Sequence, residues 1–394
     1  MDVPHLSQSP TDPEFVQDPY PFYDKARALG PLVYWADYKM AATTTHAATN
    51  AILRDRRFGR EPIDPVEFPP HIAPFYRVEA HSMLELEPPR HTRLRGLVLR
   101  AFTSRRIAAL APEIESLCHE LIDAFPAQEF DLLPTYCTAI PVRIIARLLG
   151  VPETMAPNLL RWSNAMVSMY QARRTRSIED AAAQAATDFT QFLTEYIQQR
   201  RSRPADDLIT HLIAAEEDGE KLTTDELITT CILLLNAGHE ATVHTLGNGV
   251  KALLDHGADP DWLAEEAIEN TVEEILRFDP PLHMFTRYAY DDIDLFGHSF
   301  KRGEEVACLL AAAGRDPQTA SNPAKFDPKR TKPSHQAFGA GLHFCIGAPL
   351  ARLEMAAALK ILFQRCPKLR ITETPEYANV YHFHGLKSLM VRTA

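Results

Sequence analysis

Residues 338–347 read Phe338-Gly339-Ala340-Gly341-Leu342-His343-Phe344-Cys345-Ile346-Gly347. Two glycines precede the cysteine, and because glycine has no side chain and permits positive φ, a tight loop there can pass close beneath a flat cofactor. Good helix formers follow from Ala348 to Lys360, so the Cys345 sulfur is expected near a helix N-terminus, whose dipole and free N–H groups favour a thiolate. The stretch therefore predicts a cysteine prepared as an iron ligand.

This stretch resembles the cysteine loop of the cytochrome P450 superfamily, whose fixed positions are matched by Phe338, Gly341, His343, Cys345 and Gly347. The resemblance implies haem b as the cofactor, with the Cys345 thiolate as the axial ligand of its iron and with Phe338 and Gly347 beside it. It also implies the fold: a mostly α, triangular single domain over residues 1–394, with a minor β region and the haem between a long central helix and the cysteine-loop helix.

Periodicity and turn signals along the chain agree with a mostly helical fold. They predict an irregular opening segment through Pro21, strands at 32–35 and 40–44, one amphipathic helix at 104–125, a helix ending at Gly150, a loop at 201–207, a long buried helix from a Thr223/Glu226 capping box to about Leu253, and strands around Ile293, Leu295, Phe300 and Val306.

Composition excludes several classes of function. A formal charge of −11 argues against nucleic acid as a partner, because phosphate binding needs clustered Lys and Arg. No apolar run is long enough to span a bilayer, and the first twenty residues are acidic and rich in proline, unlike a secretion signal. The six cysteines contain no Cys-x-x-Cys pair, so the usual zinc spacing is missing. We expect a cytoplasmic enzyme.

Two further sets of residues match the family in the expected order. Glu274 and Arg277 lie three apart on one helical face, and Arg330 follows in a Phe-Asp-Pro-x-Arg segment; the resemblance implies that these charges form a buried cluster. Haem propionates need cationic hydrogen-bond donors, with Arg preferred for its fork of N–H groups. The residues that match the family's propionate positions are His91, Arg95, Arg287 and His343.

Residues 237–242 read Ala-Gly-His-Glu-Ala-Thr and resemble the family's oxygen-activating segment. Gly238 is expected to let the helix lie against the haem, and Glu240 supplies the acid. The usual threonine is replaced by Ala241, which removes the hydroxyl that normally assists oxygen activation. Since protons need a relay, we hypothesise that Thr242 completes it with Glu240, water or a substrate hydroxyl; alternatively, Thr242 only bonds the preceding helical turn.

Other functions compete for the same segment. His239-Glu240 with His244 suggests a zinc hydrolase, but the histidines are five apart, which turns the second roughly 140° around the helix from the first. The missing threonine could instead indicate a peroxide-driven oxygenase or an isomerase-like haem enzyme. A non-catalytic haem sensor would need no acid and hydroxyl on this helix.

The resemblance implies insertion of one atom of dioxygen into a small organic substrate, with electrons from NAD(P)H through a ferredoxin and its reductase. We expect a monomer. By family position the pocket is lined by Met83, Ala241, Leu282, Met284, Phe285 and the segment 382–386. These residues suggest a largely apolar substrate, although such stretches are as often ordinary core packing.

Overall fold

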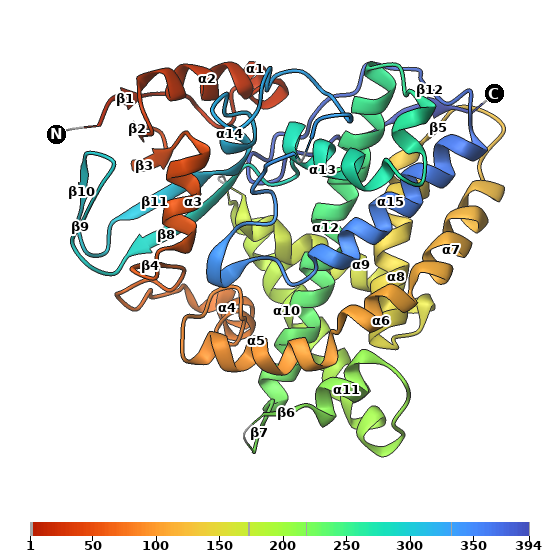
Figure 1. Ribbon diagram of the computed structural model, residues 1–394. Helices are drawn as coiled ribbons and strands as arrows, with labels where there is room; N and C mark the ends of the chain where they lie inside the picture. The colour runs from red at the N-terminus through yellow and green to blue at the C-terminus, as the bar shows by residue number, and fades with distance from the viewer. Residues whose placement is uncertain (1–2, 172–173, 218, 332, 394) are drawn as a thin grey trace.

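The computed structural model describes residues 3–171, 174–217, 219–331 and 333–393. Its central element is helix α12 (Thr224–Asp255), which crosses the molecule behind the cysteine-loop helix α15 (Ala348–Arg365) (Figure 1). The hydroxyl of Thr223 accepts the N–H of Glu226, whose carboxylate accepts the N–H of Thr223, so the predicted capping box starts α12. Most side chains of α12 are buried, because α8, α9, α10 and α15 pack around it.

The other α-helices are distributed along the whole length of the sequence. They are α1 (Pro13–Gln17), α2 (Tyr20–Leu29), α3 (His46–Arg54), α4 (Ala73–Glu79), α5 (Arg90–Ala101), α6 (Ser104–Ala109), α7 (Ala111–Asp123), α8 (Ala139–Leu149), α9 (Ala156–Val167), α10 (Arg176–Ser202), α11 (Leu208–Ala214), α13 (Ile268–Phe278) and α14 (Leu310–Gly314).

The β portion is dominated by a mixed six-stranded sheet of order β1-β2-β3-β11-β8-β4. Its strands are β1 (His5–Leu6), β2 (Leu32–Trp35), β3 (Met40–Thr43), β4 (Phe58–Gly59), β8 (Met284–Ala289) and β11 (Glu305–Leu309). Strand β11 pairs parallel with β3 and antiparallel with β8, which brings the N-terminal and C-terminal halves of the chain into one sheet. The smaller strands are β5 (Phe130–Asp131), β6 (Glu216–Glu217), β7 (Glu220–Lys221), β9 (Ile293–Leu295), β10 (His298–Phe300), β12 (Arg370–Ile371) and β13 (Met390–Arg392).

In the view of Figure 1 the outline is roughly triangular, with the six-stranded sheet at one corner and helices over the rest. This confirms the predicted mostly α architecture with a minor β region. Among the described residues, no helix is both long and apolar enough to cross a membrane.

Several predicted elements are confirmed. The strands at 32–35 and 40–43 pair antiparallel, and helix α8 ends at Gly150, which has a φ of 78°. The segment 203–207 joins α10 to α11, and strands β9, β10 and β11 lie where the late hydrophobic residues predicted them.

Two predictions are wrong. The opening segment is not irregular, because the Asp12 carboxylate accepts the N–H of Phe15 and Pro13 occupies the first turn of α1, while α2 begins at Tyr20. The single helix at 104–125 is two helices that meet at Leu110. Pro112 lies in the first turn of α7, where its missing N–H is harmless, but it would break a continuous helix.

Candidate active site

The backbone of the cysteine loop explains its glycines. Gly339 and Gly341 have φ values of 69° and 68°, in the left-handed region that glycine adopts without strain. A Cβ atom on Gly341 would lie 2.3 Å from the carbonyl oxygen of Leu53 at the end of α3, so the loop touches backbone there. The Cys345 N–H donates to the carbonyl oxygen of Phe338 at 3.0 Å, which closes the loop.

The sulfur of Cys345 lies at the N-terminus of α15, as predicted. Gly347 is the N-cap residue, and the backbone N–H groups of Gly347 and Ala348 donate to the sulfur. Burial nevertheless raises the pKa of the Cys345 thiol, although these two N–H groups and the charges of Arg95 and Arg352 act to lower it. The effect of burial therefore exceeds the combined effect of the two N–H groups and the two guanidinium charges.

Glu273, Arg352 and His335 form an ion-pair network next to the cysteine loop, which the sequence did not predict. The guanidinium of Arg352 lies over the ring of Phe338, 4.5 Å from its centroid, and donates to both carboxylate oxygens of Glu273 at 2.6 and 2.9 Å. His335 lies 3.0 Å from the same carboxylate. Burial acts to raise the pKa of Glu273, but the hydrogen bonds and charges of Arg352 and His335 lower it to about 2. The only hint in the sequence was that Glu273 is a second carboxylate directly before Glu274.

Glu274, Arg277 and Arg330 lie together. The Arg277 guanidinium donates to both Glu274 oxygens at 2.7 Å, and both side chains are 0% exposed. Arg330 Nε donates to Glu274 Oε2 at 3.2 Å. Arg277 also donates to the carbonyl oxygens of Gly314 and Pro323, so the charges tie α13 to the segment before the cysteine loop.

The four predicted propionate-binding side chains gather beside the cysteine loop. The rings of His91 and His343 lie 4.4 Å apart, and Arg95 donates to the carbonyl oxygen of Phe344 at 2.7 Å. Sequence reasoning missed Glu87, whose carboxylate lies 2.9 Å from His343 Nε2. Because Glu87 also interacts with the charges of His91 and Arg287, it connects all these groups except Arg95.

Burial distinguishes two of these groups, His91 and Arg287. Among the described residues, buried His91 Nδ1 has no hydrogen-bond partner. Arg287 is 3% exposed, and its guanidinium donates to the carbonyl oxygen of Thr286 at 2.7 Å. Burial lowers the pKa of Arg287 to about 10, which leaves it cationic at neutral pH. A buried cation and an orphaned imidazole fit the carboxylates of a haem.

On the opposite side, one face of α12 is uncovered. Ala237 is exposed and Ala241 half-buried, although most neighbouring residues are buried, and residues four apart share one face of a helix. Gly238 points elsewhere, because a Cβ atom there would meet the Ile145 side chain of α8 at 3.5 Å, an ordinary contact. The expectation that Gly238 serves the haem face therefore has no steric basis.

Thr242 is 4% exposed, and its hydroxyl donates to the carbonyl oxygen of Gly238 at 3.4 Å, the bond to the preceding turn. Glu240 is held by both neighbouring histidines. Its Oε2 lies 3.3 Å from His239 Nε2, and its Oε1 lies 3.1 Å from His244 Nε2. The structure thus brings His239 and His244 to one carboxylate, which the spacing of five residues did not suggest.

The substrate candidates separate into two groups. Phe285 lies against the cysteine loop near Gly339, and Leu282 pairs with Phe383. Met284, by contrast, belongs to the hydrophobic core that contains Phe15 and Tyr381 under the N-terminal helices, so we withdraw it as a substrate contact. Met83 is 6% exposed and packs in the main hydrophobic core.

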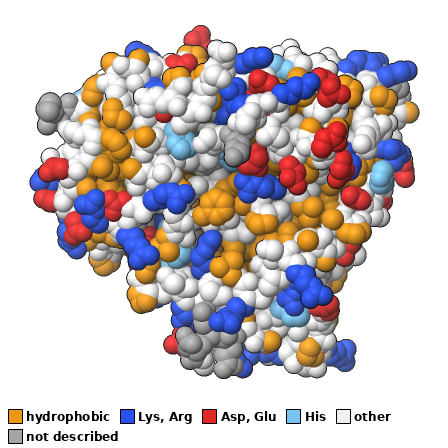
Figure 2. Space-filling view, viewed as in Figure 1, with side chains coloured by type: hydrophobic (Ala, Val, Ile, Leu, Met, Phe, Trp, Pro, Cys, Tyr) orange, Lys and Arg blue, Asp and Glu red, His pale blue; other side chains and the backbone are white. Residues whose placement is uncertain are grey.

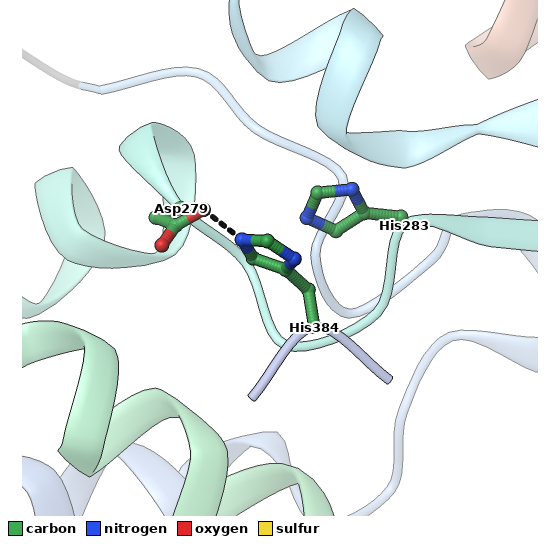
Figure 3. A group of neighbouring side chains, drawn as sticks. All are labelled: Asp279, His283 and His384. Carbon is green, nitrogen blue, oxygen red and sulfur yellow. Dashed lines mark ion pairs between the residues drawn. The ribbon is translucent and has the colours of Figure 1, made fainter. Parts of the chain in front are cut away.

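The C-terminal segment 382–386 is anchored by a buried polar cluster of Asp279, His283 and His384 (Figure 3). His384 Nε2 lies 3.4 Å from Asp279 Oδ1. The hydroxyls of Tyr20 and Tyr377 donate to the two Asp279 oxygens, each at 2.7 Å. Since both oxygens already accept hydrogen bonds, the cluster is a hydrogen-bonded anchor. Asp279 and His283 lie far before Cys345 in the sequence, and His384 lies after it. No motif in the sequence predicted that these three residues would meet.

A cysteine loop under a long helix, with a buried arginine and an unpartnered imidazole beside the loop, is the arrangement expected of a haem-thiolate protein. Comparison with known proteins agrees: a family described as Cytochrome P450 matches residues 30–266 and 266–375. The chain is 36% identical to the cytochrome P450 monooxygenase PikC of Streptomyces venezuelae, over 96% of this chain and 92% of that protein. It is 34% identical to the biotin biosynthesis cytochrome P450 of Bacillus subtilis, over 98% and 99%.

Solved structures support the same assignment. The crystal structure of P450BioI in complex with hexadec-9Z-enoic acid ligated acyl carrier protein superimposes with a TM-score of 0.90 at 34% identity, covering 96% of this chain and 99% of that one. The chain belongs to the cytochrome P450 family. It is a cytochrome P450 monooxygenase, an oxidoreductase that uses haem b with an axial cysteine thiolate, a small-molecule substrate, dioxygen and a redox partner.

Proposed function

We propose that Cys345 is the axial ligand and that this monooxygenase inserts one atom of dioxygen into a small, largely apolar organic substrate. The observation that carries the proposal is the Cys345 sulfur, which receives two backbone N–H groups at the start of α15. When bound, the haem supplies oxygen activation, which the thiolate assists by donating electron density. His91, Arg95, Arg287 and His343 would hold the propionates.

Protein side chains exclude water and orient the substrate. We expect Leu282, Phe285 and Ala241 to supply apolar lining, since Phe285 lies against Gly339 of the cysteine loop, Leu282 pairs with Phe383, and Ala241 is half-buried on α12. Glu240 is the acidic group beside Ala241, and Thr242 can join it in proton delivery when its hydroxyl leaves the Gly238 carbonyl oxygen.

Electrons are proposed to come from NAD(P)H through a ferredoxin and its reductase. The surface over α5 and the cysteine loop carries Lys and Arg side chains among hydrophobic ones (Figure 2). Phe344 and Leu99 are 40% and 46% exposed, and Arg95 lies beside Phe344. A cationic rim around exposed apolar side chains is complementary to an acidic electron-transfer protein.

We further propose that the protein is a monomeric, single-domain cytoplasmic enzyme. All six cysteines are free, which suits a reducing compartment.

The alternative function is peroxide-driven oxygenation or another haem-thiolate reaction without dioxygen. Ala241 favours it, because this position on the uncovered face of α12 has no hydroxyl.

Carbon monoxide binding and turnover together test the proposal. The reduced enzyme should show the red-shifted Soret band of thiolate ligation with carbon monoxide, and a panel of apolar substrates should shift the ferric spectrum. Product formation should then need dioxygen and ferredoxin-delivered electrons. A normal Soret position at full haem occupancy contradicts Cys345 ligation, and turnover with hydrogen peroxide alone favours the alternative. A Thr242→Ala enzyme that keeps fully coupled turnover would exclude a role for Thr242.

A further inference from the structure

Glu240 is the centre of a three-residue group, the histidine–glutamate cluster, formed by His239, Glu240 and His244. All three lie on α12, one turn of helix around Ala241. His239 and Glu240 meet at 3.3 Å, and His244 and Glu240 at 3.1 Å. Each carboxylate oxygen therefore has its own imidazole nitrogen, next to the position that lacks the usual threonine.

The surroundings of His239 determine where its protons lie. Its Nδ1 is 2.8 Å from the carbonyl oxygen of Leu235, which can only accept, so Nδ1 carries a proton. Its Nε2 is 3.3 Å from Asn164 Oδ1 and 3.3 Å from Glu240 Oε2. If the Asn164 amide is turned over, its NH₂ group instead of Oδ1 lies next to His239 Nε2, but the Glu240 carboxylate still faces the same nitrogen. Glu240 Oε2 therefore faces His239 Nε2 for either orientation of the amide.

His244 differs from His239 in its access to protons. The His239 side chain is 3% exposed, whereas that of His244 is 18% exposed. The His244 ring packs on the backbone of Gly385, where a Cβ atom would lie 1.8 Å from Nδ1, and near the ring of Phe383. His239 is thus fixed, while His244 can exchange protons and still contact Glu240.

We propose that His244 is the proton-relay residue of this site and that His239 is a positioning residue that holds the other oxygen of Glu240. The proposal rests on the monooxygenase function. In each transfer the His244 Nε2–H bond breaks and a Glu240 Oε1–H bond forms, which leaves neutral His244 with its proton on Nδ1. Glu240 then releases the proton toward the uncovered face of α12, and water returns one to His244. Two such transfers supply the two protons that accompany the two electrons from the reductase.

Electrostatics keep the Glu240 carboxylate ionised before each transfer, so that it has a free site for the proton. Burial acts to raise the pKa of Glu240, but the hydrogen bonds and charges of His239 and His244 lower it well below its ordinary value. Glu240 is therefore a carboxylate at neutral pH. From neighbouring elements, α9 brings neutral Asn164, α8 brings apolar Ile145, and the C-terminal segment brings Phe383 and His384, whose own charge interacts with His244.

The test compares His244→Gln with His256→Gln in the ferredoxin-supported enzyme. Glutamine can donate a hydrogen bond to Glu240 but cannot carry a second proton. His256 is a matched control, since it ends the same helix and bonds the Ala252 carbonyl oxygen. General acid–base catalysis contributes about 10²–10⁴-fold, so with His239 still present we expect His244→Gln to lower product formed per NADPH about tenfold, with hydrogen peroxide formed instead. His256→Gln should match the wild type.

Two further readouts separate a relay from a structural role. The infrared C=O band of protonated Glu240, observed in the carbon-monoxide-bound enzyme, should appear at higher pH in His244→Gln than in the wild type. Glu240→Gln/His244→Gln should lose no more coupling than Glu240→Gln alone, because His244 acts through Glu240. If His244→Gln fails to bind haem, His244→Asn replaces it in the same comparison.

The outcomes are distinct. Full coupling in His244→Gln, with an unmoved infrared band, overturns the relay while leaving the monooxygenase function intact. Loss of coupling beyond that of Glu240→Gln in the double variant also overturns it. If the wild type itself lacks the thiolate spectrum or dioxygen-dependent product, the proposed function and the relay both fail.

Discussion

The cysteine loop and the facing segment of α12 lie on opposite sides of the haem space and are built on different principles. In the loop, backbone contacts decide the structure: Gly341 touches the backbone of Leu53, and N–H groups meet the sulfur of Cys345. On α12 the helix is regular and side chains decide, because His239 and His244 bind Glu240 beside Ala241. The family pattern is therefore kept where backbone geometry allows no substitute, and changes where other side chains can do the same chemistry.

The largest effect is expected from Cys345→Ser. Serine keeps the loop backbone but removes the thiolate, so the red-shifted carbon monoxide band and the monooxygenase activity should disappear together. Cys366→Ser, at the end of α15, is the control and should keep both. Retained thiolate-type absorption in Cys345→Ser would show that the loop does not supply the ligand.

The next largest effect is expected at the buried charge cluster of Glu274, Arg277 and Arg330. Arg277→Met leaves Glu274 charged and 0% exposed, which should lower the free energy of unfolding by about 3–5 kcal/mol in denaturant titration. Arg176→Met removes an exposed helical pair with Asp180 and should cost about 0–1 kcal/mol. Equal losses in the free energy of unfolding for the two variants would show that the buried cluster does not stabilise the fold as its geometry indicates.

Two glycine substitutions sharpen the comparison directly. Gly341→Ala forces a side chain into a left-handed position against a carbonyl oxygen, so we expect a loss of about 1–3 kcal/mol and weaker haem retention. Gly238→Ala adds a methyl group at ordinary contact distance on a helix and should gain about 0.5–1 kcal/mol. Thermal unfolding of the two holoenzymes measures both, and a reversed order would contradict the division between backbone and side-chain control.

The smallest effect concerns pH. Because the pKa of Glu273 falls to about 2 in the folded protein, its ionised form contributes stability that is complete above the ordinary carboxyl range and is lost as the pH falls toward 2. Glu273→Gln lacks this contribution, so its deficit of about 1 kcal/mol should be constant at neutral pH and vanish in acid. A deficit that is as large in acid as at neutral pH would show that packing, not charge, is responsible.

The sequence alone determined the family, the position of the cysteine loop at the start of a helix, the central helix and the pairing of Glu274 with Arg277. These features depend on local spacing, because a capping box, a helical face or a glycine loop is complete within a few residues. It did not indicate that Met284 packs with Phe15 or that Gly238 faces Ile145 of α8, since spacing does not tell which neighbour lies across from a residue.

Only the tertiary structure decided how distant residues meet. It brought Glu87 to His343, Arg352 to Phe338 and Gly385 to His244. Each of these contacts joins segments whose approach is set by packing of the whole core, and no local pattern records it. The chemistry nearest the reaction, in which two histidines share one carboxylate, follows from that packing: α9 and the C-terminal segment confine the imidazoles against Glu240.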